Sequence, residues 1–290
     1  MSTSSRSAWR PELRGFLNVQ RLVEDDTAAL RFKMRISEKF RGLLDPSNAF
    51  FHIQLMNQQP HFPGFLIAIE GIDGSGKSTQ AQLVQEALEA RKMAVIRTRE
   101  PTAGKWGQLL RNSAETGRLS IEEEVETFLK DRQEHVETKI GPALRNGTIV
   151  ITDRYYFSTA AYQGSRGVDP DELIRRNEAF APEPDLLVLL DVDPESGLDR
   201  IRLRGDKANL FEKTDSLKKA REIFLKIKKP YLFRIDARQQ PEEITNLILR
   251  QFTALYVERI ARSTLAPMEK LKAILSFFGS DESATKATIP

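Results

Sequence analysis

The sequence predicts a three-layer α/β fold, in which helices cover both faces of a five-stranded parallel sheet. Apolar segments of strand length alternate with helical patterns, at residues 65–69, 94–98, 148–152, 186–191 and 231–235. This alternation is typical of a parallel sheet, because a crossover between parallel strands usually contains a helix. Strands covered on both faces are apolar throughout, and residues 186–190 read LLVLL.

A glycine-rich loop follows the first apolar segment and precedes a helical pattern. Residues 71–78 read GIDGSGKS, the form G-x-x-x-x-G-K-[ST] of a P-loop. Glycine permits backbone conformations that a Cβ would forbid, so successive N–H groups can converge on phosphate. Lys77 adds a cation for the β- and γ-phosphates, and the Ser78 hydroxyl can hold Mg²⁺. We expect ATP to bind the loop residues Gly71, Ile72, Asp73, Gly74, Ser75, Gly76, Lys77, Ser78 and Thr79.

The helices between the strands have recognisable starts. After the loop, apolar side chains recur on one helix face at Ala81, Val84, Ala87 and Leu88. Ser120 and Glu123 form a capping-box pattern for a helix that runs past Arg132, and we expect Pro142 to break or kink it. Pro241 opens a last helix, to about residue 260.

Composition describes a globular protein with a sizeable core. Of 290 residues, 40% are hydrophobic and 29% charged, and none is cysteine, which excludes disulfides and thiolate chemistry. We expect a cytoplasmic protein without a secretory signal or a membrane span. Residues 64–260 carry a net charge of −1, so we expect no nucleic-acid partner.

The predicted catalytic domain covers residues 64–260. Residues 1–63 form an N-terminal extension whose role the pattern does not indicate, and residues 60–64 (PHFPG) resemble a linker. Residues 261–290 form a C-terminal tail that we expect to be partly disordered.

Asp153 and Arg154 directly follow the third apolar segment. Ligands of open α/β sheets bind at the carboxyl ends of the strands. There a carboxylate can support Mg²⁺, and an arginine can stabilise the charge that passes between two phosphates. The alternative is an exposed Asp–Arg pair; its position relative to the P-loop strand favours the functional interpretation.

Phe128 and Arg132 lie four residues apart and so share a helix face. An aromatic ring can stack on a nucleobase, and a guanidinium beside it can donate to a carbonyl. By itself the pair is weak evidence, because a helical phenylalanine more often belongs to the core.

A basic segment includes Arg200, Arg202, Arg204 and Lys207. A lid of this kind can close over a transferring phosphoryl group, exclude water and stabilise its charge. Without the P-loop, a solvated basic helix would explain the segment equally well.

In order and spacing, residues 65–250 resemble the thymidylate kinase family of P-loop nucleoside monophosphate kinases. The matching segments are residues 70–79 (EGIDGSGKST), 98–101 (TREP), Phe128 with Asp131-Arg132, 153–158 (DRYYFS), 161–164 (AYQG) and the arginine lid. Together they cover about two thirds of the chain.

The resemblance implies roles at the phosphate and sugar of dTMP. Asp73 would contact the sugar 3′-OH, and Arg99 and Arg154 would hold the acceptor phosphate. Asp153 would support Mg²⁺ together with Ser78. Each of these residues occupies a matching motif position.

The resemblance also implies roles at the base. Phe128 would stack on thymine, Arg132 would donate to its O4, and Gln163 would help to read the base edge. Tyr162 would press against C2′ and so exclude a ribose hydroxyl. Relatives of this kind are usually homodimers, which implies a homodimer here.

The chain departs from the family pattern in the P-loop. Some relatives place an arginine where this sequence has Gly74, so Arg204 or Arg202 would act in transfer together with Lys77, Asp73 and Arg154.

The resemblance therefore implies an ATP-dependent kinase that converts dTMP to dTDP with Mg²⁺. Two alternatives stay open. The acceptor could be another pyrimidine monophosphate such as dUMP, because a pocket distinguishes one methyl group by only about 1–3 kcal/mol. Alternatively, the chain could be a P-loop switch or scaffold with vestigial catalysis, in which the extensions bind a partner.

Overall fold

The computed structural model describes residues 64–117, 119–203, 210–263, 265 and 269–270. Within them, five parallel strands form one sheet in the order β2-β3-β1-β4-β5. Their bounds are Phe65–Glu70 (β1), Val95–Arg99 (β2), Ile149–Asp153 (β3), Leu186–Asp191 (β4) and Leu232–Asp236 (β5). The predicted fold class is confirmed, and each strand begins within one residue of its expected start.

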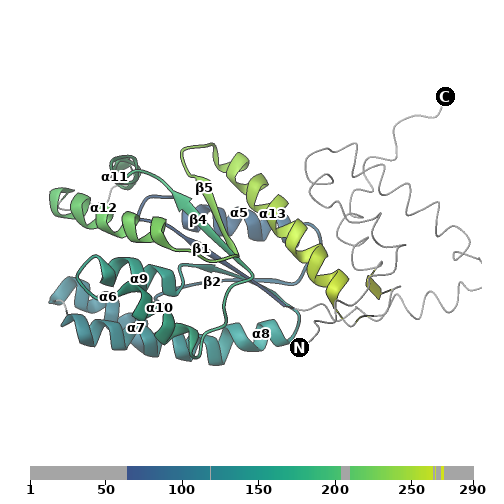
Figure 1. Cartoon of the computed structure of the whole chain (residues 1–290), viewed down its shortest axis with the longest axis horizontal. Coiled ribbons are helices and arrows are strands. Elements are labelled where there is room, and N and C mark those ends of the chain that lie inside the picture. Colours follow the sequence, from purple (N-terminus) through teal and green to yellow (C-terminus); the bar gives the residue numbers. More distant parts are fainter. Residues whose placement is uncertain (1–63, 118, 204–209, 264, 266–268, 271–290) are drawn as a thin grey trace, which may run out of the picture. The chain divides into compact units, whose positions relative to one another are not determined.

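Helices cover both faces of this sheet (Figure 1). Helices α5 (Lys77–Glu89) and α13 (Pro241–Arg262) pack against each other on one face. Helices α7 (Ile121–His135) and α9 (Tyr156–Gly164) pack together on the other. The remaining α-helices of the described residues are α6 (Lys105–Thr116), α8 (Gly141–Arg145), α10 (Pro170–Glu178), α11 (Pro194–Leu203) and α12 (Leu210–Lys226).

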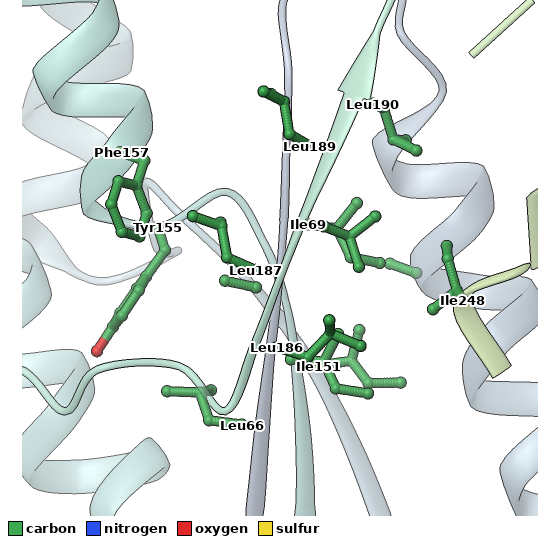
Figure 2. Packing of buried hydrophobic residues seen from close by; sticks show 14 of the residues in the cluster. Leu66, Ile69, Ile151, Tyr155, Phe157, Leu186, Leu187, Leu189, Leu190 and Ile248 are labelled. Carbon is green, nitrogen blue, oxygen red and sulfur yellow. The ribbon is translucent and has the colours of Figure 1, made fainter. Parts of the chain in front are cut away.

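The core lies on both sides of the inner strands β1 and β4, as Figure 2 shows. Leu187 points toward Tyr155 and Phe157 at the start of α9, whereas Leu190 points toward Ile248 of α13. All five side chains are buried. Burying β1 and β4 on both faces explains why their sequences are continuously apolar, and it places the loop after β1 on a rigid support.

The helix that begins at the Ser120–Glu123 capping box changes its hydrogen-bonding pattern just before Pro142. After α7 the chain continues as a π-helical turn, Val136–Ile140, and then as α8, which has Pro142 in its first turn. Proline has no backbone N–H to donate to the preceding turn, so a change in the helical hydrogen-bonding pattern is expected just before it. The α-helical pattern is therefore interrupted directly before Pro142, which agrees with the expected break or kink.

Parallel register brings the predicted phosphate-binding residues to one edge of the sheet. Asp153 is in register with Ile69 of β1 and with Arg99 of β2. The P-loop and Arg154 follow directly on β1 and β3. We call residues 70–79, Arg99 and residues 153–154 the phosphate edge.

Some predictions lie outside the described residues. These are the N-terminal extension 1–63, most of the tail, and Arg204 with the rest of residues 204–209 between α11 and α12. None of the described helices combines the length and apolar composition that crossing a membrane requires.

Candidate active site

The P-loop leaves the N-terminus of α5 open. Its N-cap residue, Gly76, has φ +96° and offers no side chain to the first N–H groups of the helix. By contrast, Ser120 caps α7 and Asp169 caps α10 through side-chain oxygens. A polar cavity of about 140 Å³ lies at this open end. Uncapped N–H groups beside a polar cavity fit the phosphates of a nucleotide.

Gly74 is required by the packing of the loop. Its φ is +81°, and a Cβ there would lie 2.0 Å from the carbonyl oxygen of Gly197 in α11. No side chain fits so close to a backbone oxygen. The P-loop is therefore held against the helix that precedes the predicted lid.

Lys77 lies beneath the same cavity. Its side chain is buried, and Nζ donates to the carbonyl oxygen of Ile72 at 2.8 Å. Burial, and the nearby Arg154 cation, lower the pKa of Lys77 to about 7. An anion bound in the cavity would favour the charged form, so this lysine is poised to gain a proton when phosphate arrives.

Ser78 and Asp153 are brought together from α5 and β3. The Ser78 hydroxyl donates to Oδ2 of Asp153, and both residues line the cavity. Hydroxyl and carboxylate oxygens are hard metal ligands of the kind that Mg²⁺ prefers next to substrate phosphates. These two side chains therefore fit the predicted ion.

Three predicted acceptor-site residues meet beside the P-loop. The guanidinium of Arg154 forms an ion pair with Asp73 and lies 5.3 Å from the ring of Tyr162. The backbone N–H of Asp73 donates to the Tyr162 hydroxyl at 3.0 Å. Arg154 has φ +72°, an unusual conformation for a bulky residue, and its N–H donates to Ile69 at 3.0 Å. Strain held by such contacts is common at functional residues.

Sequence reasoning assigned no role to Glu70, which holds this arrangement together. Its buried carboxylate accepts from the N–H of Tyr155 at 2.8 Å and from the N–H and hydroxyl of Ser158 at 2.9 and 2.6 Å. Glu70, which ends β1, thereby caps the N-terminus of α9. Burial raises the pKa of Glu70 to about 7, against the effect of these hydrogen bonds. Only its place at the start of the P-loop motif could have drawn attention to it.

Arg132 lies in a buried cluster of polar side chains. Its side chain is 2% exposed; Nε donates to Glu100 at 2.8 Å, Nη1 to Asn177, and Nη2 to Thr159 at 3.1 Å. His135 contacts the other oxygen of Glu100 at 2.9 Å. We call these five residues the Arg132 network. Burial by itself raises the pKa of Glu100, but Arg132 and His135 outweigh it, so the pKa is lowered and the carboxylate stays charged.

The other two predicted base-site residues, Phe128 and Gln163, are not members of the Arg132 network. Phe128 is half-buried on α7. Gln163 is buried on α9, and its side-chain oxygen accepts from Arg166 at 3.0 Å. No hydrogen bond or ring contact joins either residue to Arg132 in the described part of the chain.

Arg99 is exposed at the end of β2 and lines two cavities. One is the cavity of about 140 Å³ at the N-terminus of α5, which we call the phosphate cavity; the other, of about 650 Å³, extends along the edge strand β2 past Thr98 and His135. Arg99 therefore borders both cavities, and its contact with the acceptor phosphate stays a prediction.

The lid arginines differ in position. Arg200, which sequence reasoning grouped with the lid, donates to the carbonyl oxygens of Gly74 at 3.4 Å and Ala237 at 2.8 Å. Arg202 pairs with Asp199 on the exposed surface of α11 and does not line the phosphate cavity. The structure thus brings Arg200, and not Arg202, to the P-loop.

Three features lie around the phosphate cavity: the uncapped N-terminus of α5, the oxygens of Ser78 and Asp153, and the cations of Arg99 and Arg154. Together they define a P-loop phosphotransferase site. The sequence model of the thymidylate kinase family matches residues 69–248. A thymidylate kinase of Xanthomonas euvesicatoria pv. vesicatoria is 50% identical over 198 residues, which cover 68% of this chain and 85% of the relative. This chain belongs to the thymidylate kinase family.

Other relatives agree. A thymidylate kinase of Xanthomonas oryzae pv. oryzae is 47% identical over 224 residues, or 76% of this chain and 96% of the relative. A thymidylate kinase of Akkermansia muciniphila is 49% identical over 181 residues, or 62% of this chain and 87% of the relative.

Proposed function

We propose that this chain transfers the γ-phosphoryl group of ATP to dTMP, which gives dTDP and ADP. The observation that carries the proposal is the phosphate edge, where an uncapped helix N-terminus faces a cavity that Arg99 and Arg154 also line. Membership of the thymidylate kinase family supports it.

The donor site is the P-loop. Its backbone N–H groups would hold the phosphates of ATP, and Lys77 would neutralise charge on the β- and γ-phosphates. Ser78 and Asp153 would hold Mg²⁺, which would supply positive charge to neutralise the phosphates of ATP. Both residues line the cavity at the mouth of the loop.

The acceptor phosphate would lie between Arg99 and Arg154. An oxygen of that phosphate attacks the γ-phosphorus in line, the bond to the β-phosphate oxygen breaks, and no covalent enzyme intermediate forms. The protein then contributes mainly position and charge. Asp73 would release part of its pairing with Arg154 to accept the sugar 3′-OH. Tyr162, which already contacts the Asp73 backbone, would close the space at C2′.

The base would lie against α7 and α9. We propose that Phe128 stacks on thymine, that Arg132 donates to its O4, and that Gln163 supports the base edge. The charged and buried state of Arg132 favours this role, because a guanidinium already held in place loses little freedom on binding.

Three parts of the account stay predictions. Arg204 or Arg202 would stabilise the transferring group when the lid closes. The protein would form a homodimer and act in the cytoplasm, as the family resemblance and the composition indicate.

Initial rates of ADP formation with Mg²⁺ would test the function across dTMP, dUMP, ribosyl TMP, dCMP, CMP and AMP. We expect a strong preference for dTMP. A preference for dUMP would assign the same chemistry to another acceptor. Turnover of none of them, with ATP still bound, would contradict the proposal and favour a nucleotide switch.

A further inference from the structure

The Arg132 network joins four segments that are distant in sequence. Arg132 comes from α7, Thr159 from α9, Asn177 from α10, and Glu100 from the loop after β2. Each of these four side chains is at most 3% exposed. A buried guanidinium is stable only where its charge and its donors are satisfied, so this network fixes the orientation of Arg132 before any ligand binds.

Asn177 is the member whose orientation is set independently of Arg132. Its side-chain nitrogen donates to the carbonyl oxygen of Leu173, one turn earlier in α10, at 2.7 Å. The amide oxygen must then face the other way, and there it accepts from Nη1 of Arg132. Asn177 is fully buried, so it cannot exchange this contact for water.

The hydrogen bonds of the Arg132 network use all but one of the N–H groups of Arg132. An arginine carries five N–H groups, one on Nε and two on each Nη nitrogen. Glu100 takes Nε and lies 2.6 Å from Nη2, and Thr159 takes the other Nη2 hydrogen. Asn177 takes one hydrogen of Nη1. One Nη1 hydrogen therefore has no acceptor in the part of the chain that the structure describes.

We propose that Asn177 is a positioning residue for base selection: by accepting one Nη1 hydrogen of Arg132, it directs the other toward the 4-position of a pyrimidine. The inference rests on the proposed function, because it assumes a pyrimidine monophosphate as acceptor.

The chemistry predicts which pyrimidines this donor accepts. Thymine and uracil carry a carbonyl oxygen at position 4, which accepts the hydrogen. Cytosine carries an amino group there, which would place two donors face to face beside a fixed positive charge. Sites built to hydrogen-bond one group reject an analogue that cannot pair by far more than an apolar pocket does. The arrangement selects against cytosine and is indifferent to the C5 methyl group.

The test compares kcat and KM of full-length variants with dTMP and dCMP. Asn177→Leu keeps the approximate volume and removes the acceptor. Asn177→Asp loses the N–H that donates to Leu173 but keeps an oxygen that can accept from Arg132, and pairing with the Arg132 cation would still orient it. Glu172→Gln, whose half-exposed side chain pairs with Arg175 on the same helix, is the matched control. Thermal unfolding and ADP binding show whether each variant keeps its fold and its donor site.

We expect Asn177→Leu to raise the KM for dTMP about tenfold or more and to lower the dTMP/dCMP preference about as much. The kcat for dTMP should change little, because the base is remote from the reacting phosphate. Asn177→Asp should retain the preference within about threefold, and Glu172→Gln should match the wild type.

The proposal fails if Asn177→Leu folds and keeps both the KM and the preference, which would make the contact merely structural. It also fails if Asn177→Asp loses as much selectivity as Asn177→Leu. Where Asn177→Leu does not fold, Asn177→Ser, which is too short to reach Nη1, takes its place with the same expected results. Failure of the proposed function is distinguished by the wild type, which would then not turn over dTMP at all.

Discussion

The phosphate edge and the Arg132 network differ in how far protein groups already pair with their positive groups. At the phosphate edge, N–H groups of α5 have no cap, Lys77 is held at a lowered pKa, and Arg99 is exposed. In the network, Arg132 is 2% exposed and bonded to three protein side chains. At the phosphate edge Arg154 pairs with Asp73, but the helix N–H groups and Lys77 remain for a ligand to pair with, whereas the network contains the counter-charge of its own arginine.

The difference indicates two kinds of preorganisation. The phosphate edge gains its interactions when phosphates arrive, so its residues should govern catalysis and nucleotide affinity. The network keeps one cation in one orientation, so its residues should govern selectivity and stability. Variants in the two regions should therefore fail in different measurements.

The largest effect is expected for Arg154→Ala. Removing a charge-stabilising arginine should lower kcat/KM for dTMP about a thousandfold and leave ATP affinity nearly unchanged. Steady-state kinetics and ATP-binding calorimetry measure the two. Arg175→Ala, at an exposed surface ion pair of α10, is the matched control. Near-normal turnover by Arg154→Ala would remove Arg154 from the acceptor site.

Gly74→Ala tests whether the packing of the loop, and not only its charge, makes the phosphate edge. The Cβ would meet the Gly197 carbonyl, so we expect ATP affinity to fall about a hundredfold, roughly 3 kcal/mol. Gly167→Ala has a similar positive φ but nothing within 4 Å of its Cβ, and isolates backbone strain, about 1–2 kcal/mol of stability. Equal effects of the two variants on ATP affinity would contradict the close packing.

Phe128→Ala separates a ligand contact from a core contact on α7. Stacking on a base is worth about 1–3 kcal/mol, so the KM for dTMP should rise about tenfold with a small change in the melting temperature. Leu129→Ala, the adjacent residue packed against the core, should show the reverse pattern. A large loss of stability with an unchanged KM would make Phe128 a core residue.

The smallest effect is expected in the pH dependence of ATP binding. Below pH 7 Lys77 is already protonated; above it the free lysine is mostly neutral, because burial lowers its pKa to about 7. Bound phosphate favours the cation, so binding at pH 8 should take up as much as about one proton, and affinity should fall as the pH rises above 7.

Calorimetry in buffers of different ionisation enthalpy measures this uptake. The Lys77→Arg variant, which keeps its charge, should lose it. Glu70→Gln should retain it, and this control is needed because burial raises the pKa of Glu70 to about 7 as well. Uptake that disappears in Glu70→Gln would assign the proton to the carboxyl group.

The two regions also differ in how far the sequence predicts them. The P-loop and the Asp153–Arg154 pair are contiguous motifs at strand ends, and parallel register alone brings them together. The Arg132 network is assembled from residues up to 77 positions apart, as from Glu100 to Asn177. Local periodicity carries no signal for such contacts. The sequence therefore predicts Phe128 and Arg132 as a pair. It does not predict that Glu100, His135 and Asn177 hold Arg132 in place.

One further contact could not be predicted from the sequence. Arg200 reaches the P-loop because Gly74 and Gly197 pack in contact, which brings α11 against the loop. This contact does not follow from a pattern along the chain, since it depends on how two distant segments meet.

The most direct test follows labelled phosphate. The full-length protein is incubated with Mg²⁺, dTMP and ATP labelled at the γ-phosphate, and the products are separated. We predict that the label passes to dTDP, one equivalent for each ADP formed, in the wild type but not in Arg154→Ala. Label that is released only as inorganic phosphate, or that stays in ATP while ATP is bound, would contradict the account.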